Sequence, residues 1–167
     1  MKALTVHQPY ASLLAVGAKL FETRSWYTNY RGLTAIHAAA KKPTDILSIE
    51  DVSFIRKAAE ALGLESQYNI YDVLNRLDSL PRGKIISVGE IAHCWRCIGE
   101  DRRGDLMILK NAGHSNWENS YINDRELLFG DFSKGRSAWE FKNMKMLSEP
   151  IPAKGKQGLW EWQESEG

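Results

Sequence analysis

The chain has 167 residues, of which 43% are hydrophobic and 26% are charged, and 22 basic against 21 acidic residues leave a net charge of +1. Such totals are typical of a soluble globular protein and fit a single domain with a core of ordinary size. Bulk charge therefore points to no partner class. No apolar run approaches the roughly 20 residues that cross a bilayer, and no signal peptide is evident at the start. We expect a cytoplasmic protein with no membrane association.

In chain order, the predicted elements mix short strands with helices. A short apolar helix is expected at 10–16, beginning after Pro9 and ending at Gly17. Apolar residues at three- and four-residue spacing predict two helices within 44–80, an insertion that we expect to be solvated on its outer face. Alternation and β-branched or aromatic content predict strands at 3–6, 20–26, 33–39, 84–95, 137–143 and around 160. These elements indicate an α+β fold: a small mixed β-barrel of about six strands, partly closed, with peripheral helices.

Basic residues concentrate in two segments. Six basic residues against one acid give residues 1–42 a charge of +5, and six against two give residues 133–157 a charge of +4. The two segments form either one basic face or two separate solvated surfaces, and the sequence leaves both interpretations open.

The two cysteines, Cys94 and Cys97, form a lone CxxC after a predicted strand. Structural zinc needs two more ligands with recognisable spacing, and a redox CxxC is expected at a strand-to-helix junction, which this is not. Two reduced thiols in a cytosolic domain are therefore favoured over metal or redox use. We expect no metal and no cofactor.

The stretch GAKLFETRSW, residues 17–26, carries three complementary charges in six positions. If 20–26 is a strand, Glu22, Arg24 and Trp26 share one face, while Thr23 points to the other. Lys19 lies in the preceding connector, with a side chain long enough to reach Glu22. The cluster is either a surface ion-pair network, worth about 0–1 kcal/mol, or a functional site, and the charges alone do not decide between them.

A second acidic candidate lies in the strand predicted at 84–95. Alternation there places Glu90 on one face with Ile86, Val88, Ala92 and Cys94. A carboxylate among apolar neighbours must lie at a wet edge, find a partner or accept a raised pKa, because burying it unpaired is costly.

The segment GAKLFETR fits the signature GxKxxExR, by which the chain resembles the ASCH domain family, a branch of the PUA-like superfamily. The resemblance extends in order through HQPYASLL, IHAAAK, PRGKIISVGEI, FGDF, GRSAWEF and PIPAKGKQGLWEW. It covers nearly the whole chain except the helical insertion at 44–80. What it implies is a PUA-like barrel, with a cleft lined by signature residues, in a superfamily that commonly handles RNA or modified nucleosides.

The resemblance gives the candidate residues a function. Lys19 and Arg24 are cations suited to phosphate or carbonyl oxygens, and Glu22 accepts hydrogen bonds from base amino groups. Further candidates for ligand binding are the two aromatic residues Tyr10 and Trp26, together with His37 and Arg136. Arg136 follows a polar stretch with Trp117 and Tyr121, which either closes the site or merely covers the barrel. We expect a monomer that binds RNA, single-stranded nucleic acid or a nucleoside.

Two alternatives to a binding protein remain open. Some small ASCH proteins deacylate N4-acetylcytidine with a lysine, a threonine three residues later and a downstream glutamate. Lys19 matches that lysine, and Glu90 is a plausible match for the glutamate. Glu22, however, stands where those proteins have threonine. A carboxylate cannot replace a hydroxyl nucleophile, so hydrolysis of acylated cytidine or RNA would need Glu22 or Glu90 as general base. The other alternative is a protein-interaction module like those in coactivator-linked ASCH domains.

Overall fold

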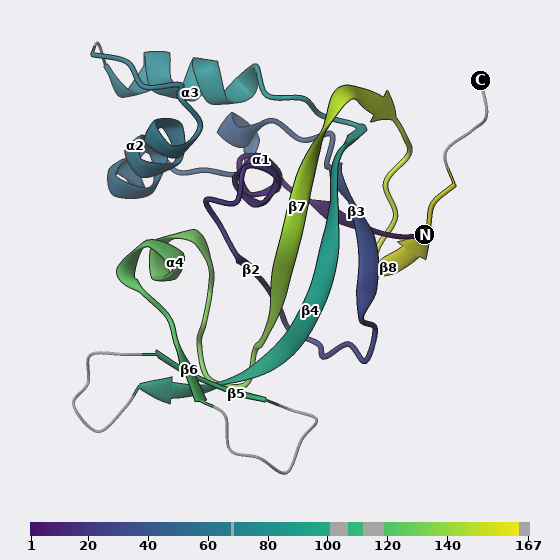
Figure 1. Ribbon diagram of the computed structural model, residues 1–167. Coiled ribbons are helices and arrows are strands. Elements are labelled where there is room, and N and C mark those ends of the chain that lie inside the picture. The colour runs from purple at the N-terminus through teal and green to yellow at the C-terminus, as the bar shows by residue number, and fades with distance from the viewer. Residues whose placement is uncertain (68, 101–106, 112–118, 164–167) are drawn as a thin grey trace. The chain divides into compact units, whose positions relative to one another are not determined.

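The computed structural model describes residues 1–67, 69–100, 107–111 and 119–163. The chain divides into two compact units. The first comprises 1–18, 33–89 and 144–167, and the second comprises 19–32 and 90–143. Two long strands, β4 (Lys84–Glu100) and β7 (Ser137–Pro152), supply residues to both units (Figure 1).

Three strands with largely buried side chains organise the first unit. The first strand, β1 (Lys2–Val6), pairs parallel with β3 (Gly32–Ala38) and antiparallel with β8 (Leu159–Glu161). Their core includes Ala3, Ala35, Ile85, Trp160 and Trp162. The adjoining helix α1 (Tyr10–Ala15) is short, and the buried Gln8 side chain accepts a hydrogen bond from the Ser12 N–H within its first turn. The helix predicted at 10–16 is confirmed.

The helical segment of the first unit contains both helices that periodicity predicts. A short 3-10 turn, η1 (Pro43–Asp45), precedes α2 (Val52–Ala61) and α3 (Ile70–Asp78). The two helices lie side by side in Figure 1. Their apolar stripes are buried, with Ile55 in α2 and Leu77 in α3 fully enclosed, as amphipathic helices require.

The second unit combines strands with one short helix. Its strand β2 (Phe21–Arg24) pairs antiparallel with β7, and β5 (Met107–Asn111) pairs with β4 and with β6 (Asn119–Tyr121). The helix α4 (Asp124–Phe129) begins at Asn123, whose side chain accepts from the Glu126 N–H. The core of the second unit includes Phe21, Trp95, Cys97, Ile122, Phe132 and Ala138.

The α+β class is confirmed, with helices at the periphery and six strands in the main path, consistent with a PUA-like fold. The strand order is β2-β7-β4-β3-β1-β8, so within the described residues the path is open and ends at β2 and β8. Strands β5 and β6 were not predicted, because their sequence lacks clear alternation. No helix in the described ranges is long and apolar enough to span a membrane.

Two details of the long strands differ from prediction. In β4 side chains are buried on both faces: Ile86 and Cys94 on the face that carries Glu90, and Ile85, Ser87 and Ile91 on the opposite face. Small polar residues such as Ser87 can occupy a buried face, and this breaks the apolar alternation on which the prediction relied. Strand β7 continues to Pro152 instead of ending at 143, since proline is tolerated at strand ends and edges.

Candidate functional site

Strand β2 places two of the predicted charges on one face. Glu22 pairs with Trp139 of β7, and Arg24 pairs with Ser137. The Arg24 Nη2 lies 3.1 Å from Glu22 Oε1, whereas the Thr23 hydroxyl accepts from the Asp131 N–H at 3.2 Å. Strand alternation therefore separates Thr23 from the charged pair, as the sequence predicts.

Lys19 lies behind this pair and is almost fully buried. Its Nζ donates to the Phe129 carbonyl at 2.7 Å and lies 3.7 Å from Glu22 Oε2, with only 1% of the side chain exposed. The ammonium also fits against Gly130, where an added Cβ would lie 3.4 Å from Nζ. Lys19 thus binds the last carbonyl of α4, a position where a cation interacts favourably with the helix dipole. We call Lys19, Glu22 and Arg24 the signature cluster.

Glu126 of α4 adds a second carboxylate that the sequence analysis missed. It is buried, and its Oε1 accepts from the Leu20 N–H at 2.6 Å. Its other oxygen, Oε2, has no hydrogen-bond partner among the described residues. Asn123 and Glu126 have the three-residue spacing of a helix N-terminus and precede an apolar run, so this signal was present in the sequence.

Burial shifts the two deepest groups in opposite directions. Desolvation lowers the pKa of Lys19, and the negative charges of Glu22 and then Glu126 partly offset it. Desolvation also raises the pKa of Glu126, against the Leu20 N–H and the Lys19 charge. Both shifts favour neutral forms.

The other predicted residues of the second unit take different positions. Trp26 lies just beyond β2, is 38% exposed and meets Trp139 edge-on at 4.5 Å between ring centroids. Arg136 donates to the Thr23 carbonyl at 3.4 Å and lies 3.2 Å from Asp131. Glu90 accepts from Asn143 at 3.4 Å.

Two candidates belong to the first unit. The Tyr10 ring packs against Phe54, with centroids 5.2 Å apart. His37 is buried, its Nε2 lies 3.0 Å from the Ala153 carbonyl oxygen, and its ring meets Trp160 edge-on. The side chains of Trp117 and Tyr121 lie outside the described residues.

Cys94 and Cys97 are free and buried. Burial raises the pKa of both thiols, that of Cys97 to about 11, so neither is a reactive thiolate near neutral pH. In the part of the chain that the structure describes, no group of three or more histidine, cysteine or acidic side chains is placed to hold a metal ion.

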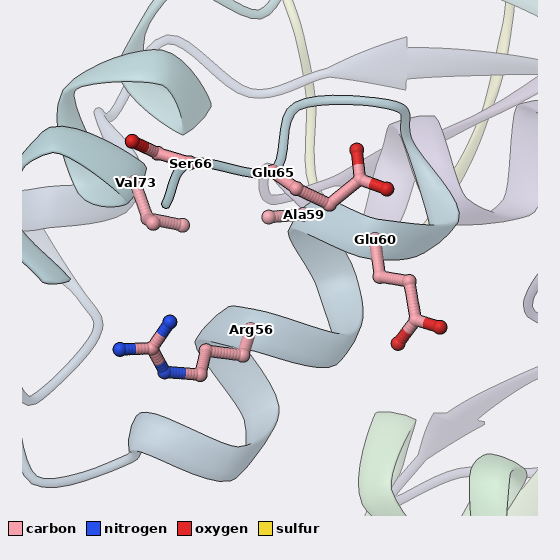
Figure 2. A pocket seen from close by; sticks show the side chains of 6 residues that line it. All are labelled: Arg56, Ala59, Glu60, Glu65, Ser66 and Val73. Carbon is pink, nitrogen blue, oxygen red and sulfur yellow. The ribbon is translucent and has the colours of Figure 1, made fainter. Parts of the chain in front are cut away.

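A separate hollow of about 320 Å³ lies against α2 and α3. Figure 2 shows the Arg56 guanidinium on one side and the carboxylates of Glu60 and Glu65 pointing away from it. Because its charged groups diverge, this hollow does not present one recognition surface. The signature cluster is the better candidate.

Comparison with known proteins shows the family of this chain. A segment of 41 residues is 61% identical to human Activating signal cointegrator 1 and 54% identical to the mouse protein of that name. The segment covers 25% of this chain and 7% of each relative, so the chain corresponds to a small part of either protein. The family model for the ASCH domain matches residues 4–94, which is more than half of the chain and includes the signature cluster. The chain therefore belongs to the ASCH domain family.

Proposed function

We propose that this chain binds single-stranded RNA or a modified nucleoside at the signature cluster, with Arg24 and Glu22 facing the ligand. The observation that carries the proposal is the pair itself: a guanidinium and a carboxylate held 3.1 Å apart, with 26% of the Arg24 side chain exposed. Arg24 supplies donors for a phosphate or carbonyl oxygen, and Glu22 supplies an acceptor for an amino group.

In this proposal Lys19 positions the binding groups and does not itself contact the ligand. Its ammonium is too deeply buried to reach a ligand, but it lies between the Phe129 carbonyl and Glu22. Lys19 therefore fixes Glu22 against α4, and Glu22 in turn orients Arg24. Preorganisation of this kind lowers the entropic cost of binding.

Aromatic and cationic side chains near the cluster support a nucleic-acid ligand. Trp26 is exposed beyond the end of β2. Two guanidinium groups lie near the half-buried Tyr27 ring, that of Arg31 at 5.9 Å and that of Arg96 at 6.0 Å from its centroid. Exposed rings offer stacking surfaces to unpaired bases, and arginines beside them contribute cation–π and phosphate interactions.

The test measures binding of a short single-stranded RNA and of cytidine analogues by fluorescence anisotropy and calorimetry. We expect Arg24→Ala to weaken RNA binding about tenfold or more, the effect of losing ~1.4 kcal/mol. Lys134→Ala, which removes an exposed cation of the same unit, is the matched control and should change affinity less than about twofold. Equal effects of the two variants would contradict the proposal.

The salt and base dependence of the same assay separates this site from a general basic surface. Affinity that falls steeply from about 50 to 200 mM salt and ignores base composition indicates phosphate contacts alone. That result would favour a protein-interaction module, an idea that the cointegrator relatives suggest. A preference among bases that Glu22→Gln abolishes would support recognition by the signature cluster.

A hydrolase is the second candidate, favoured by the lowered pKa of Lys19 beside Glu22 and Glu126. In that mechanism a carboxylate takes a proton from water as the water oxygen bonds to the acyl carbon or phosphorus, while Arg24 stabilises the developing oxyanion. The bond to the amine or alcohol then breaks, and the carboxyl group returns the proton to this leaving group. Incubation with acylated cytidines and with RNA, resolved by mass spectrometry, tests it. Product that disappears in Glu22→Gln but persists in Lys134→Ala supports catalysis, and no product from the wild type with either substrate set argues against it.

A further inference from the structure

The first unit contains a pocket of about 510 Å³ that takes no part in the proposed function. It lies beside the carboxyl ends of β1 and β3, under the segment that leads from β7 to β8. The residues that give it chemical character are Thr5, His37, Ala153, Lys154, Lys156 and Gln157. The volume is in the range of pockets that hold small organic ligands.

The charge of this pocket has one sign. Lys154 and Lys156 line it and are exposed, and the lining includes no acidic residue. The Lys156 ammonium lies 5.8 Å from the centroid of the Trp160 ring, an arrangement that keeps the side chain near the pocket. Two lysines without a competing carboxylate attract an anion, and lysine is a common phosphate ligand.

Backbone groups reinforce this preference. Residues 154–157 lie outside the strands, and among the described residues none of their N–H groups donates a backbone hydrogen bond. Backbone N–H groups that have no backbone acceptor can donate hydrogen bonds to a bound anion. The same short segment therefore offers both cationic side chains and backbone donors.

The floor of the pocket is rigid and largely apolar. The His37 Nε2–H donates to the Ala153 carbonyl at 3.0 Å, and the ring rests edge-on against Trp160. The segment above it approaches so closely that a Cβ on Gly155 would lie 2.5 Å from the His37 ring and 3.0 Å from the Thr5 hydroxyl. Ala39, Ala40, Gly83 and Gly155 contribute only small groups to the lining, which leaves a wall without bulky side chains.

We infer that this pocket binds a phosphate attached to a flat ring, as in a nucleoside monophosphate. Lys154, Lys156 and the neighbouring N–H groups hold the phosphate, and the ring lies against the alanine and glycine wall. Gln157 and Thr5 supply hydrogen bonds to polar groups on the ring or sugar. The ligand is either a free mononucleotide or the phosphorylated terminal nucleotide of a longer strand.

The test uses AMP, adenosine and inorganic phosphate as probes, with calorimetry and amide NMR on the full chain. We expect AMP to shift the amide signals of Gly155, Lys156 and Gln157 and the indole signal of Trp160. The double variant K154A/K156A should weaken AMP binding about tenfold or more. Lys57→Ala, which removes an exposed lysine of α2 outside the pocket, should leave binding unchanged.

Gly155→Ala provides a second variant that keeps both lysines. The added Cβ collides with the His37 ring, so the segment must shift, and AMP affinity should fall although the charge is the same. A melting curve and the dispersion of the NMR spectrum show whether each variant is folded.

The outcomes are distinct. Inorganic phosphate that binds as tightly as AMP, or millimolar AMP that leaves the signals of residues 154–157 in place, would overturn the inference. Tighter binding of a terminally phosphorylated oligonucleotide than of AMP, lost in K154A/K156A, supports it and identifies the strand end as the source. Failure at this pocket is separable from failure at the signature cluster, because the amide signals of residues 154–157 report on this pocket alone, whatever effect Arg24→Ala has on RNA affinity.

Discussion

Lysines occupy two contrasting environments in this protein, one in each unit. Lys19 in the second unit is buried against the end of α4 with two carboxylates nearby, whereas Lys154 and Lys156 in the first unit are exposed at the edge of a pocket. A buried lysine contributes to the architecture of its site, because its charge is already matched by protein groups. An exposed lysine beside a pocket is available to a ligand. The same residue type therefore has opposite consequences when it is removed.

Removing Lys19 should have the largest effect on stability. Lys19→Met removes one of the two cations beside Glu22, the positive charge near Glu126 and the donor to the Phe129 carbonyl, so we expect a loss of about 3–5 kcal/mol. Lys156→Met, the matched exposed control, should cost less than about 0.5 kcal/mol. Urea unfolding of both variants at neutral pH measures the difference, and similar small losses would show that Lys19 is not the centre of the site.

A double-mutant cycle measures how much of this loss comes from one pair, Lys19 and Glu126. If Lys19 and Glu126 interact, the losses from Lys19→Met and Glu126→Gln should not add, with a coupling energy of about 1–3 kcal/mol. Glu126→Gln keeps an oxygen that can accept from the Leu20 N–H, so the cycle reports mainly the charge. A coupling near zero would assign the role of counter-ion to Glu22 alone.

The pH dependence of stability tests the burial of His37 in the pocket lined by Lys154 and Lys156. Burial lowers the pKa of His37, so the unfolded chain binds a proton that the folded chain resists. Stability should therefore fall as pH drops from about 6.5 through the lowered folded pKa. Thermal melts of the wild type and of His37→Gln should diverge in this window, with the variant less sensitive to acid. Parallel pH profiles would mean that the pKa of His37 is the same in the folded and unfolded chains.

The smallest effect should come from an exposed ion pair. Lys57 and Glu60 lie 2.7 Å apart, closer than Lys19 and Glu22 at 3.7 Å, yet both side chains are more than half exposed. Lys57→Ala should change stability by about 0.5 kcal/mol or less. If Lys57→Ala loses as much stability as Lys19→Met in the same urea series, burial does not predict the stability contribution of these ion pairs better than the distance between their charges does.

Much of the signature cluster was predictable from local sequence. Alternation along one strand separates Glu22 and Arg24 from Thr23, and the connector places Lys19 within reach of Glu22. The depth of Lys19 was not predictable, because the carbonyl that binds it belongs to Phe129, 110 residues later. A count of charges treats Lys19 as a surface cation, whereas the fold removes it from the surface.

The helices and most strands followed from periodicity and turn residues, since these signals act over a few residues. Strands β5 and β6 lie among polar residues whose pairing depends on distant partners, and the burial of β4 on both faces depends on what packs against it. His37 illustrates the same limit. Its strand was predictable, but its contact with Ala153 arises from a segment 116 residues away.

The close approach of Gly155 to His37 implies a rule for sequence change at these two positions. The imidazole occupies the space into which any side chain at 155 would grow, so the two sites cannot vary independently. In a set of related chains, we expect alanine or a larger residue at 155 only where position 37 carries a smaller group. Such paired substitution would show that the segment can lie against the His37 ring only because residue 155 has no Cβ.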